Sequence, residues 1–199
     1  SELIFPKAKL LSKQFLSDQR FLILALVGLL PMVIMNIPLG GFFIFYEVSL
    51  YFSVIWGLFF YACFKTNQVK LKTTLNVFFL TQLCVFVAWD LLGLPKVNPF
   101  YAFTDVAFPL NILGYVFGVG LTEELGKMIP LLIILRKAKE PLIPQTMVFY
   151  GLMAGISFGV FEGVQYQITV NAEQTYDVSF FLNIARLTSL PFLHACWCG

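Results

Sequence analysis

The sequence carries little charge for its length. Of its 199 residues, 12% are charged and 59% are hydrophobic, whereas soluble domains have about 25% charged residues. Because so few charges cannot cover a water-facing surface, an ordinary soluble domain is excluded. The 13 lysines and arginines are scattered along the chain, so no basic stripe suggests a nucleic-acid partner. We therefore predict an integral membrane protein surrounded by the lipid bilayer.

Paired cysteine motifs are also missing. The four cysteines all lie in apolar runs, where cysteine usually behaves as a small buried hydrophobe. A His194-x-Cys196-x-Cys198 run ends the chain, but no second paired motif accompanies it, so its signal for a metal–thiolate site is weak. We expect these cysteines to be buried and chemically inert.

The termini lack the features of a processed or complete chain. No cleavable signal peptide is evident, because the N-terminal charged stretch is too long and no small-residue cleavage site follows it. The chain begins at Ser1 rather than Met and stops within an apolar stretch at Gly199. We expect the C-terminus to be truncated.

Long apolar stretches take the place of the missing charge. A bilayer span needs about 20 mostly apolar residues. The sequence predicts six such spans, near residues 20–37, 41–64, 73–92, 107–135, 144–170 and 178–199. The stretch before them, residues 1–19, is typical of an amphipathic surface helix. The predicted fold is an all-α, polytopic transmembrane bundle that forms a single domain over residues 1–199.

Positive charge alternates between the predicted loops. Cations precede the first span and recur between the second and third spans and between the fourth and fifth, as Lys65, Lys70, Lys72, Arg136, Lys137 and Lys139. The intervening loops are poor in cations, and the last one carries Glu173 and Asp177 instead. Because cytoplasmic loops are enriched in Lys and Arg, this alternation predicts six spans with the N-terminus in the cytoplasm.

The fourth predicted span contains three ionisable residues, Glu123, Glu124 and Lys127. A charged side chain at the centre of a span costs about 2.5–3.5 kcal/mol on insertion scales, so these groups must face protein, water or an ion. At about 100° per residue, Lys127 projects roughly 40° from Glu123 and roughly 60° from Glu124. It therefore lies between the two carboxylates and can pair with either one.

Two further spans carry polar groups. The fifth contains Glu162, with Tyr166 one turn later, and the sixth contains Arg186 and the single histidine, His194. Counted from the loops at about 1.5 Å per residue, Glu162, His194 and Glu123 all fall near mid-membrane. A structural salt bridge or a hydrogen-bonded packing histidine explains any one of these groups alone. Their common depth in three spans favours a buried catalytic site.

Small residues recur at every fourth position in two of these spans. Such stripes allow helix backbones to approach closely, and they predict tight packing of the fourth and fifth spans. Glu162 projects along the stripe of the fifth span, so its carboxylate is expected at a close helix contact. The residues of the two stripes are Gly114, Gly118, Thr122 and Gly126, and Gly151, Gly155, Gly159 and Gly163.

These polar residues resemble the motifs of a known family. Residues 123–127 match an EExxK motif, residues 161–166 match FExxxY, and His194 follows on the next span. Their order and helix placement resemble the PrsW family of intramembrane proteases, which forms a wider group with the type II CAAX prenyl proteases and the Abi proteins. The EExxxR and FxxxH patterns of CAAX-type enzymes are not matched, which disfavours prenyl-protein processing.

The resemblance implies site-1-type cleavage of membrane-anchored protein substrates, for example anti-sigma factors. It implies an enzyme of the bacterial plasma membrane whose catalytic spans lie within residues 107–199. The active site would then comprise Glu123, Glu124, Glu162 and His194. The family pattern also leads us to expect a further polar motif beyond the end of this chain.

Peptide hydrolysis requires an activated water, an oxyanion stabiliser and a proton donor for the leaving amine. Our hypothesis makes Glu123 or Glu124 the general base, while Glu162 and His194 bind a metal or orient the water. A Glu/His ligand set suits zinc. A metal-free version, in which the paired glutamates share a proton, fits the sequence equally well. The other polar residues of these spans receive structural or charge-tuning roles: Lys127, Tyr166 and Arg186.

Two other functions explain intramembrane carboxylates. A proton- or ion-coupled transporter also places such groups in its spans, but no convincing inverted repeat relates residues 20–92 to residues 107–199. A non-catalytic scaffold would use the same polar cluster for helix assembly.

Overall fold

The computed structural model describes residues 42–91, 93, 97–138 and 140–199. The predicted surface helix and the predicted first span, residues 1–19 and 20–37, lie outside this part of the chain. Within it the regular elements are all helical, and no strand occurs. In chain order they are α4 (Phe42–Phe64), α5 (Leu71–Phe86), η1 (Val87–Leu91), η2 (Pro99–Asp105), α7 (Asn111–Leu113), η3 (Gly114–Gly120), α8 (Leu121–Arg136), α9 (Pro144–Ile168), η4 (Asn171–Glu173) and α10 (Tyr176–Cys198).

Helix α9 is the centre of the bundle. It begins at Pro144, which suits a first helical position because the amide proton it lacks would have no helical partner there. In its apolar window 78% of the residues are buried, against 22% in the corresponding windows of α4 and α5. A helix that is enclosed on all sides has no need of a polar face. The side chains of residues 149–160 are accordingly all buried.

Helices α4 and α5 form an outer layer on α9. Their outward faces carry large apolar side chains that are exposed, namely Val54, Leu58, Phe59, Leu75, Phe79 and Leu83. A continuous exposed apolar surface of this kind is unfavourable in water and is suited to lipid. The layer therefore supports the prediction of a membrane protein.

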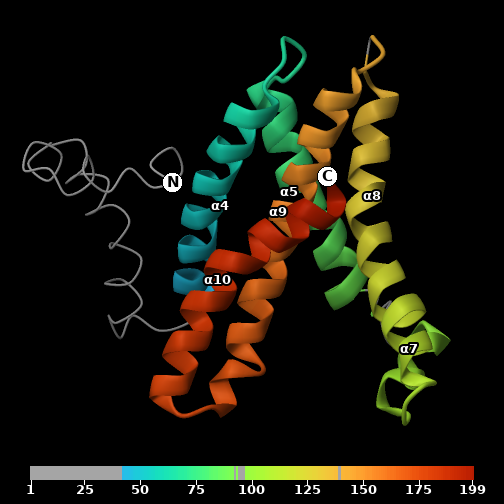
Figure 1. Cartoon of the computed structure of the whole chain (residues 1–199), viewed down its shortest axis with the longest axis vertical. Coiled ribbons are helices and arrows are strands. Elements are labelled where there is room, and N and C mark those ends of the chain that lie inside the picture. The colour runs from blue at the N-terminus through green and yellow to red at the C-terminus, as the bar shows by residue number, and fades with distance from the viewer. Residues whose placement is uncertain (1–41, 92, 94–96, 139) are drawn as a thin grey trace, which may run out of the picture.

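The cation-bearing loops lie together at one end of the bundle, at the top of Figure 1. They connect α4 to α5 and α8 to α9. Hydrogen bonds join them, because the Gln68 amide donates to the carbonyl of Pro141 at 3.1 Å and accepts from the amide of Ile143 at 2.8 Å. The turn between α9 and α10, which carries Glu173, lies at the opposite end. This separation agrees with the alternation of charge in the sequence.

Helix α10 runs antiparallel to α9 and then crosses it, so that its last turns approach α8 (Figure 1). Pro191 lies inside the helix, where proline removes a backbone hydrogen bond and favours a bend. The crossing is close. A Cβ added at Gly159 would lie 2.6 Å from the carbonyl oxygen of Leu190, and one added at Gly151 would lie 2.6 Å from that of Cys198. The close packing predicted for the glycine stripe of α9 is confirmed.

Asn98 and the short helix η2 hold the start of the helix that carries Glu123 and Glu124. The Asn98 side-chain amide, just before η2, donates to the carbonyl of Phe117 at 2.9 Å and to the hydroxyl of Thr122 at 2.9 Å. Gly118 permits this contact, because an added Cβ would lie 3.0 Å from the backbone of Tyr101. The glycine stripe of the fourth predicted span thus packs against η2.

Three of the described helical segments are long and apolar enough to cross a membrane, namely Ile44–Phe64, Leu71–Trp89 and Pro144–Glu173. They correspond to the second, third and fifth predicted spans. Helices α8 and α10, which correspond to the fourth and sixth predicted spans, do not meet that criterion of length and apolar composition. Regular α-helix in α8 covers 16 residues, although the π-helical η3 leads directly into it. Both helices carry the ionisable residues that the site requires.

The expectation that the cysteines are buried was wrong. All four are free thiols; Cys63 and Cys196 are exposed, and Cys84 and Cys198 are partly exposed. The reason is that an apolar run in a membrane helix packs against lipid as readily as against protein. An apolar sequence neighbourhood therefore does not indicate the protein interior here.

Candidate active site

Lys127 of α8 is the most deeply buried ionisable side chain of the site, with 0% of its side chain exposed. Its Nζ donates to Oε1 of Glu124 at 2.6 Å, one turn earlier on α8. It also lies 3.0 Å from Nδ1 of His194 on α10. The ring of Phe158 on α9 is on another side, with its centroid 4.5 Å from Nζ. An ion pair, a hydrogen bond and a cation–π contact together offset the loss of water around the ammonium.

The contact with Lys127 determines the tautomer of His194. A lysine ammonium has three donors and no acceptor, so Nδ1 must accept and a neutral imidazole carries its proton on Nε2. That nitrogen lies 2.5 Å from Oε2 of Glu162 on α9. The imidazole thus bridges the Lys127 ammonium and the Glu162 carboxylate. The His194 side chain is only 2% exposed.

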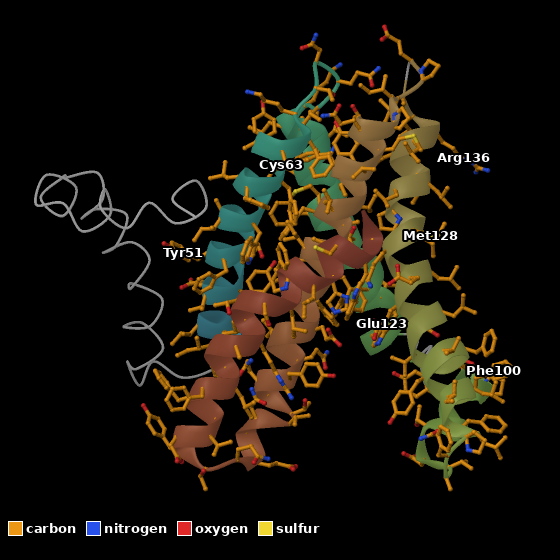
Figure 2. The ribbon with its side chains drawn as sticks, in the orientation of Figure 1. Tyr51, Cys63, Phe100, Glu123, Met128 and Arg136 are labelled. Atoms are coloured by element: carbon orange, nitrogen blue, oxygen red, sulfur yellow. The ribbon has the colours of Figure 1, made fainter. Side chains whose placement is uncertain are left out.

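Glu123 completes a three-residue cluster with Glu162 and His194. One ligand atom of each residue lies within 4.8 Å of the others. Figure 2 shows Glu123 on the side of α8 that faces α9 and α10, whereas Arg136 projects away from the bundle. Two carboxylate oxygens and one imidazole nitrogen are a suitable set for zinc, which usually keeps three protein ligands and one open position in catalytic sites. The donor set would therefore fit a metal ion if Nε2 gave up its proton and Nδ1 took one from Lys127, because a ligating imidazole is neutral.

The polar cluster is accessible from its carboxylate side. The side chains of Glu124 and Glu162 are 43% and 21% exposed, while those of Lys127 and His194 are buried. A molecule that approaches from this side therefore meets the carboxylates first. The cation and the imidazole lie behind them.

Aromatic rings surround the imidazole. The Phe158 ring lies 4.8 Å from the His194 ring, and the Trp197 ring meets it edge-on at 4.9 Å. Trp89 packs in turn against Phe158 at 5.9 Å. These contacts leave the imidazole little freedom to rotate, so packing as well as hydrogen bonds holds the orientation of the ring.

Tyr166, one turn after Glu162 on α9, forms a separate pair with Arg186 of α10. The guanidinium of Arg186 lies 4.1 Å from the centre of the Tyr166 ring. One guanidinium nitrogen, Nη1, is buried without a hydrogen-bond partner among the described residues. The pair therefore packs beside the cluster rather than hydrogen-bonding to it.

Sequence reasoning singled out Glu123, Glu124, Lys127, Glu162 and His194, and the structure brings these five side chains together. Sequence reasoning missed Tyr101 in η2. Burial raises the pKa of the Tyr101 phenol, and the nearby charge of Glu123 and Glu162 raises it further. Tyr101 therefore lies in the field of both carboxylates. No periodic pattern marks a short 3-10 helix outside the spans, so Tyr101 could not be singled out from the sequence.

We expect His194 to carry its proton on Nε2 in the metal-free protein. The chain contains one histidine, so nitrogen-15 labelling of histidine gives a single pair of ring signals in an NMR spectrum. The Nδ1 signal should be that of an unprotonated nitrogen. Lys127→Met should produce a mixture of tautomers, because Nδ1 loses its donor. Lys137→Met, which removes an exposed lysine at the end of α8, should leave the signals unchanged. A protonated Nδ1 in the unsubstituted protein contradicts the assignment.

Comparison with known proteins gives one finding. The model of the PrsW family, described as intramembrane metalloproteases, matches residues 49–199, which is more than half of the chain and includes every helix of the site. No curated protein matches the chain, and no solved structure does.

Proposed function

The chain belongs to the PrsW family of intramembrane metalloproteases, and from this we propose that it cleaves membrane-anchored protein substrates, such as anti-sigma factors, within or near the bilayer. The observation that carries the proposal is the cluster of Glu123, Glu162 and His194 beside the Glu124–Lys127 ion pair. Family membership supports a membrane protease rather than the transporter or the scaffold.

We assign the general base to Glu124. Its Oε1 accepts a hydrogen bond from Lys127 at 2.6 Å, and its partial exposure lets it reach a water molecule. A base of this kind accepts the proton of the attacking water and returns it to the leaving amine. Lys127 then acts through Glu124 and His194 and does not touch the substrate.

The remaining members of the cluster would hold the metal. Glu123, Glu162 and His194 are the proposed ligands, and zinc is the proposed metal because these donors suit it. When bound, zinc lowers the pKa of a coordinated water and polarises the scissile carbonyl. Without metal, Glu162 holds the imidazole in place through the Nε2 hydrogen bond.

We further propose that the whole chain is one transmembrane domain with six spans in a bacterial plasma membrane, with residues 107–199 forming the catalytic part. The clustering of the cation-bearing loops at one end of the bundle supports a cytoplasmic location for that end.

Thiol labelling of intact cells checks this orientation. In a variant without native cysteines, Asn67→Cys in the α4–α5 loop should resist a membrane-impermeant reagent. Gln174→Cys in the α9–α10 turn should react with it, because both positions are exposed but at opposite ends. The reverse pattern of labelling would contradict this orientation and would place the cation-bearing loops outside the cytoplasm.

Substitution of the base should abolish cleavage without unfolding the protein. We expect Glu124→Gln to lower the rate on a reconstituted single-span substrate by about 10²–10⁴-fold, the usual contribution of a general base. Glu140→Gln, which removes an exposed carboxylate in the α8–α9 loop, is the matched control and should keep full activity. Unchanged cleavage by Glu124→Gln would overturn the assignment of the base. If the intact full-length protein cleaves no substrate, the result would count against the proposed protease function.

The proposed zinc site is tested by measuring the metal content of the protein. Purified protein should contain one zinc ion per chain by elemental analysis, and His194→Ala should lose it. Cys196→Ala should retain it, because that thiol lies two residues away but is exposed and is not a member of the cluster. Fully active protein without metal would instead support the version in which the paired glutamates act alone.

A further inference from the structure

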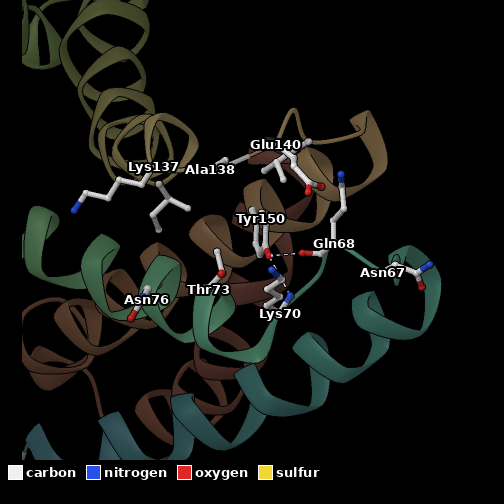
Figure 3. A pocket seen from close by; sticks show the side chains of 11 residues that line it. Asn67, Gln68, Lys70, Thr73, Asn76, Lys137, Ala138, Glu140 and Tyr150 are labelled. Atoms are coloured by element: carbon white, nitrogen blue, oxygen red, sulfur yellow. Dashed lines mark hydrogen bonds between the residues drawn. The ribbon is translucent and has the colours of Figure 1, made fainter.

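A polar cavity of about 430 Å³ lies at the end of the bundle where the two cation-bearing loops meet, remote from the site described above. Figure 3 shows it between the start of α5, the end of α8 and the start of α9. Its lining includes Lys70 and Lys137, one on each side. The volume is within the range of about 300–1,000 Å³ that is common for small-molecule sites.

The walls of this cavity are held by hydrogen bonds. The Tyr150 hydroxyl donates to the carbonyl of Gln68 at 3.2 Å and accepts from the amide of Lys70 at 3.2 Å (Figure 3). The Gln68 side chain also bridges to the α8–α9 loop. The cavity is therefore part of the fold, and its two lysines are attached to backbone segments of fixed separation.

The lining favours an anion. The residues that line the cavity include two lysines and one acidic residue, Glu140, so the lining has a net positive charge. The neutral polar residues of the lining carry hydroxyl or amide donors, although the Tyr150 hydroxyl and the Gln68 amide already donate within the protein. They are Asn67, Gln68, Thr73, Asn76 and Tyr150. A phosphate group is the ligand that such a mixture of ammonium, amide and hydroxyl donors recognises best.

The position of the cavity favours a lipid as the source of that phosphate. Apolar side chains also line it, because Ile134 near the end of α8 and Leu142 in the α8–α9 loop belong to its wall and are partly exposed. Basic pockets between helices at this level of a membrane bind lipid headgroups. We propose that this cavity binds the phosphate of an anionic phosphate ester, with a lipid headgroup as its natural source.

The proposal is tested by binding to the purified full chain in detergent, measured by native mass spectrometry. The lipid arms are phosphatidylglycerol, which is anionic, and phosphatidylcholine, which has no net charge. The soluble arms are glycerol phosphate and inorganic phosphate. We expect phosphatidylglycerol to bind in preference to phosphatidylcholine. Stronger binding of glycerol phosphate than of the lipid would keep the phosphate site but overturn the lipid as its source.

Paired substitutions separate a specific site from general attraction to the basic loops. Lys70→Gln with Lys137→Gln should weaken phosphatidylglycerol binding by about tenfold or more. Lys65→Gln with Lys72→Gln removes the same charge from exposed lysines that do not line the cavity, and it should change binding less than about twofold. Lys70→Arg with Lys137→Arg should restore binding, which excludes misfolding as the cause. Equal losses in both glutamine pairs, or no preference for the anionic lipid, would overturn the proposal.

Discussion

The architecture of the site depends on one buried charge. The ammonium of Lys127 is fully enclosed by protein, and an unpaired charge in that position would cost several kcal/mol. Its partners come from three helices: Glu124 from α8 itself, Phe158 from α9 and His194 from α10. Removing α9 or α10 from the contact would leave the ammonium with Glu124 of its own helix and without the ring of Phe158 or the imidazole of His194. The charge therefore specifies how α8, α9 and α10 meet.

Close helix packing is what allows His194 to reach that charge. Gly151 and Gly159 lie against the backbone of α10, where a Cβ would collide with carbonyl oxygens. A larger side chain at either position would push α10 outwards and withdraw the imidazole from Lys127. The same crossing brings Nε2 of His194 to Glu162. The glycine stripe, which has no chemistry of its own, thus determines whether the polar residues form one cluster or three isolated groups.

The members of the site could be predicted from the sequence because charge inside an apolar span is costly and therefore conspicuous. Depth along each helix could be counted, and the structure agrees with the grouping of Glu123, Glu162 and His194. The partner of Lys127 could not be predicted, because Lys127 projects between the two glutamates, roughly 40° from Glu123 and roughly 60° from Glu124. The choice of Glu124 follows from the position of α10, which no single-helix argument contains.

Other features had no pattern in the sequence. Tyr101 comes from a short 3-10 helix that Asn98 fastens to η3 and α8. The cavity lined by Lys70 and Lys137 is formed by two loops that are distant in the chain and meet through Gln68. The exposure of Cys63 and Cys196 depends on which side of an apolar helix faces lipid. All three depend on contacts between segments rather than on periodicity within one segment.

The fixed imidazole also bears on how the cluster would take up a metal ion. In the described arrangement Nε2 of His194 is already directed at Glu162, and aromatic rings on two sides limit its rotation. If the cluster bound a metal ion, Glu123, Glu162 and His194 would hold it, and Nε2 would have to give up its proton. Ligands held in this way lose little conformational freedom on binding, which favours affinity. A site assembled by packing is for this reason better suited to metal than three flexible side chains with the same donors.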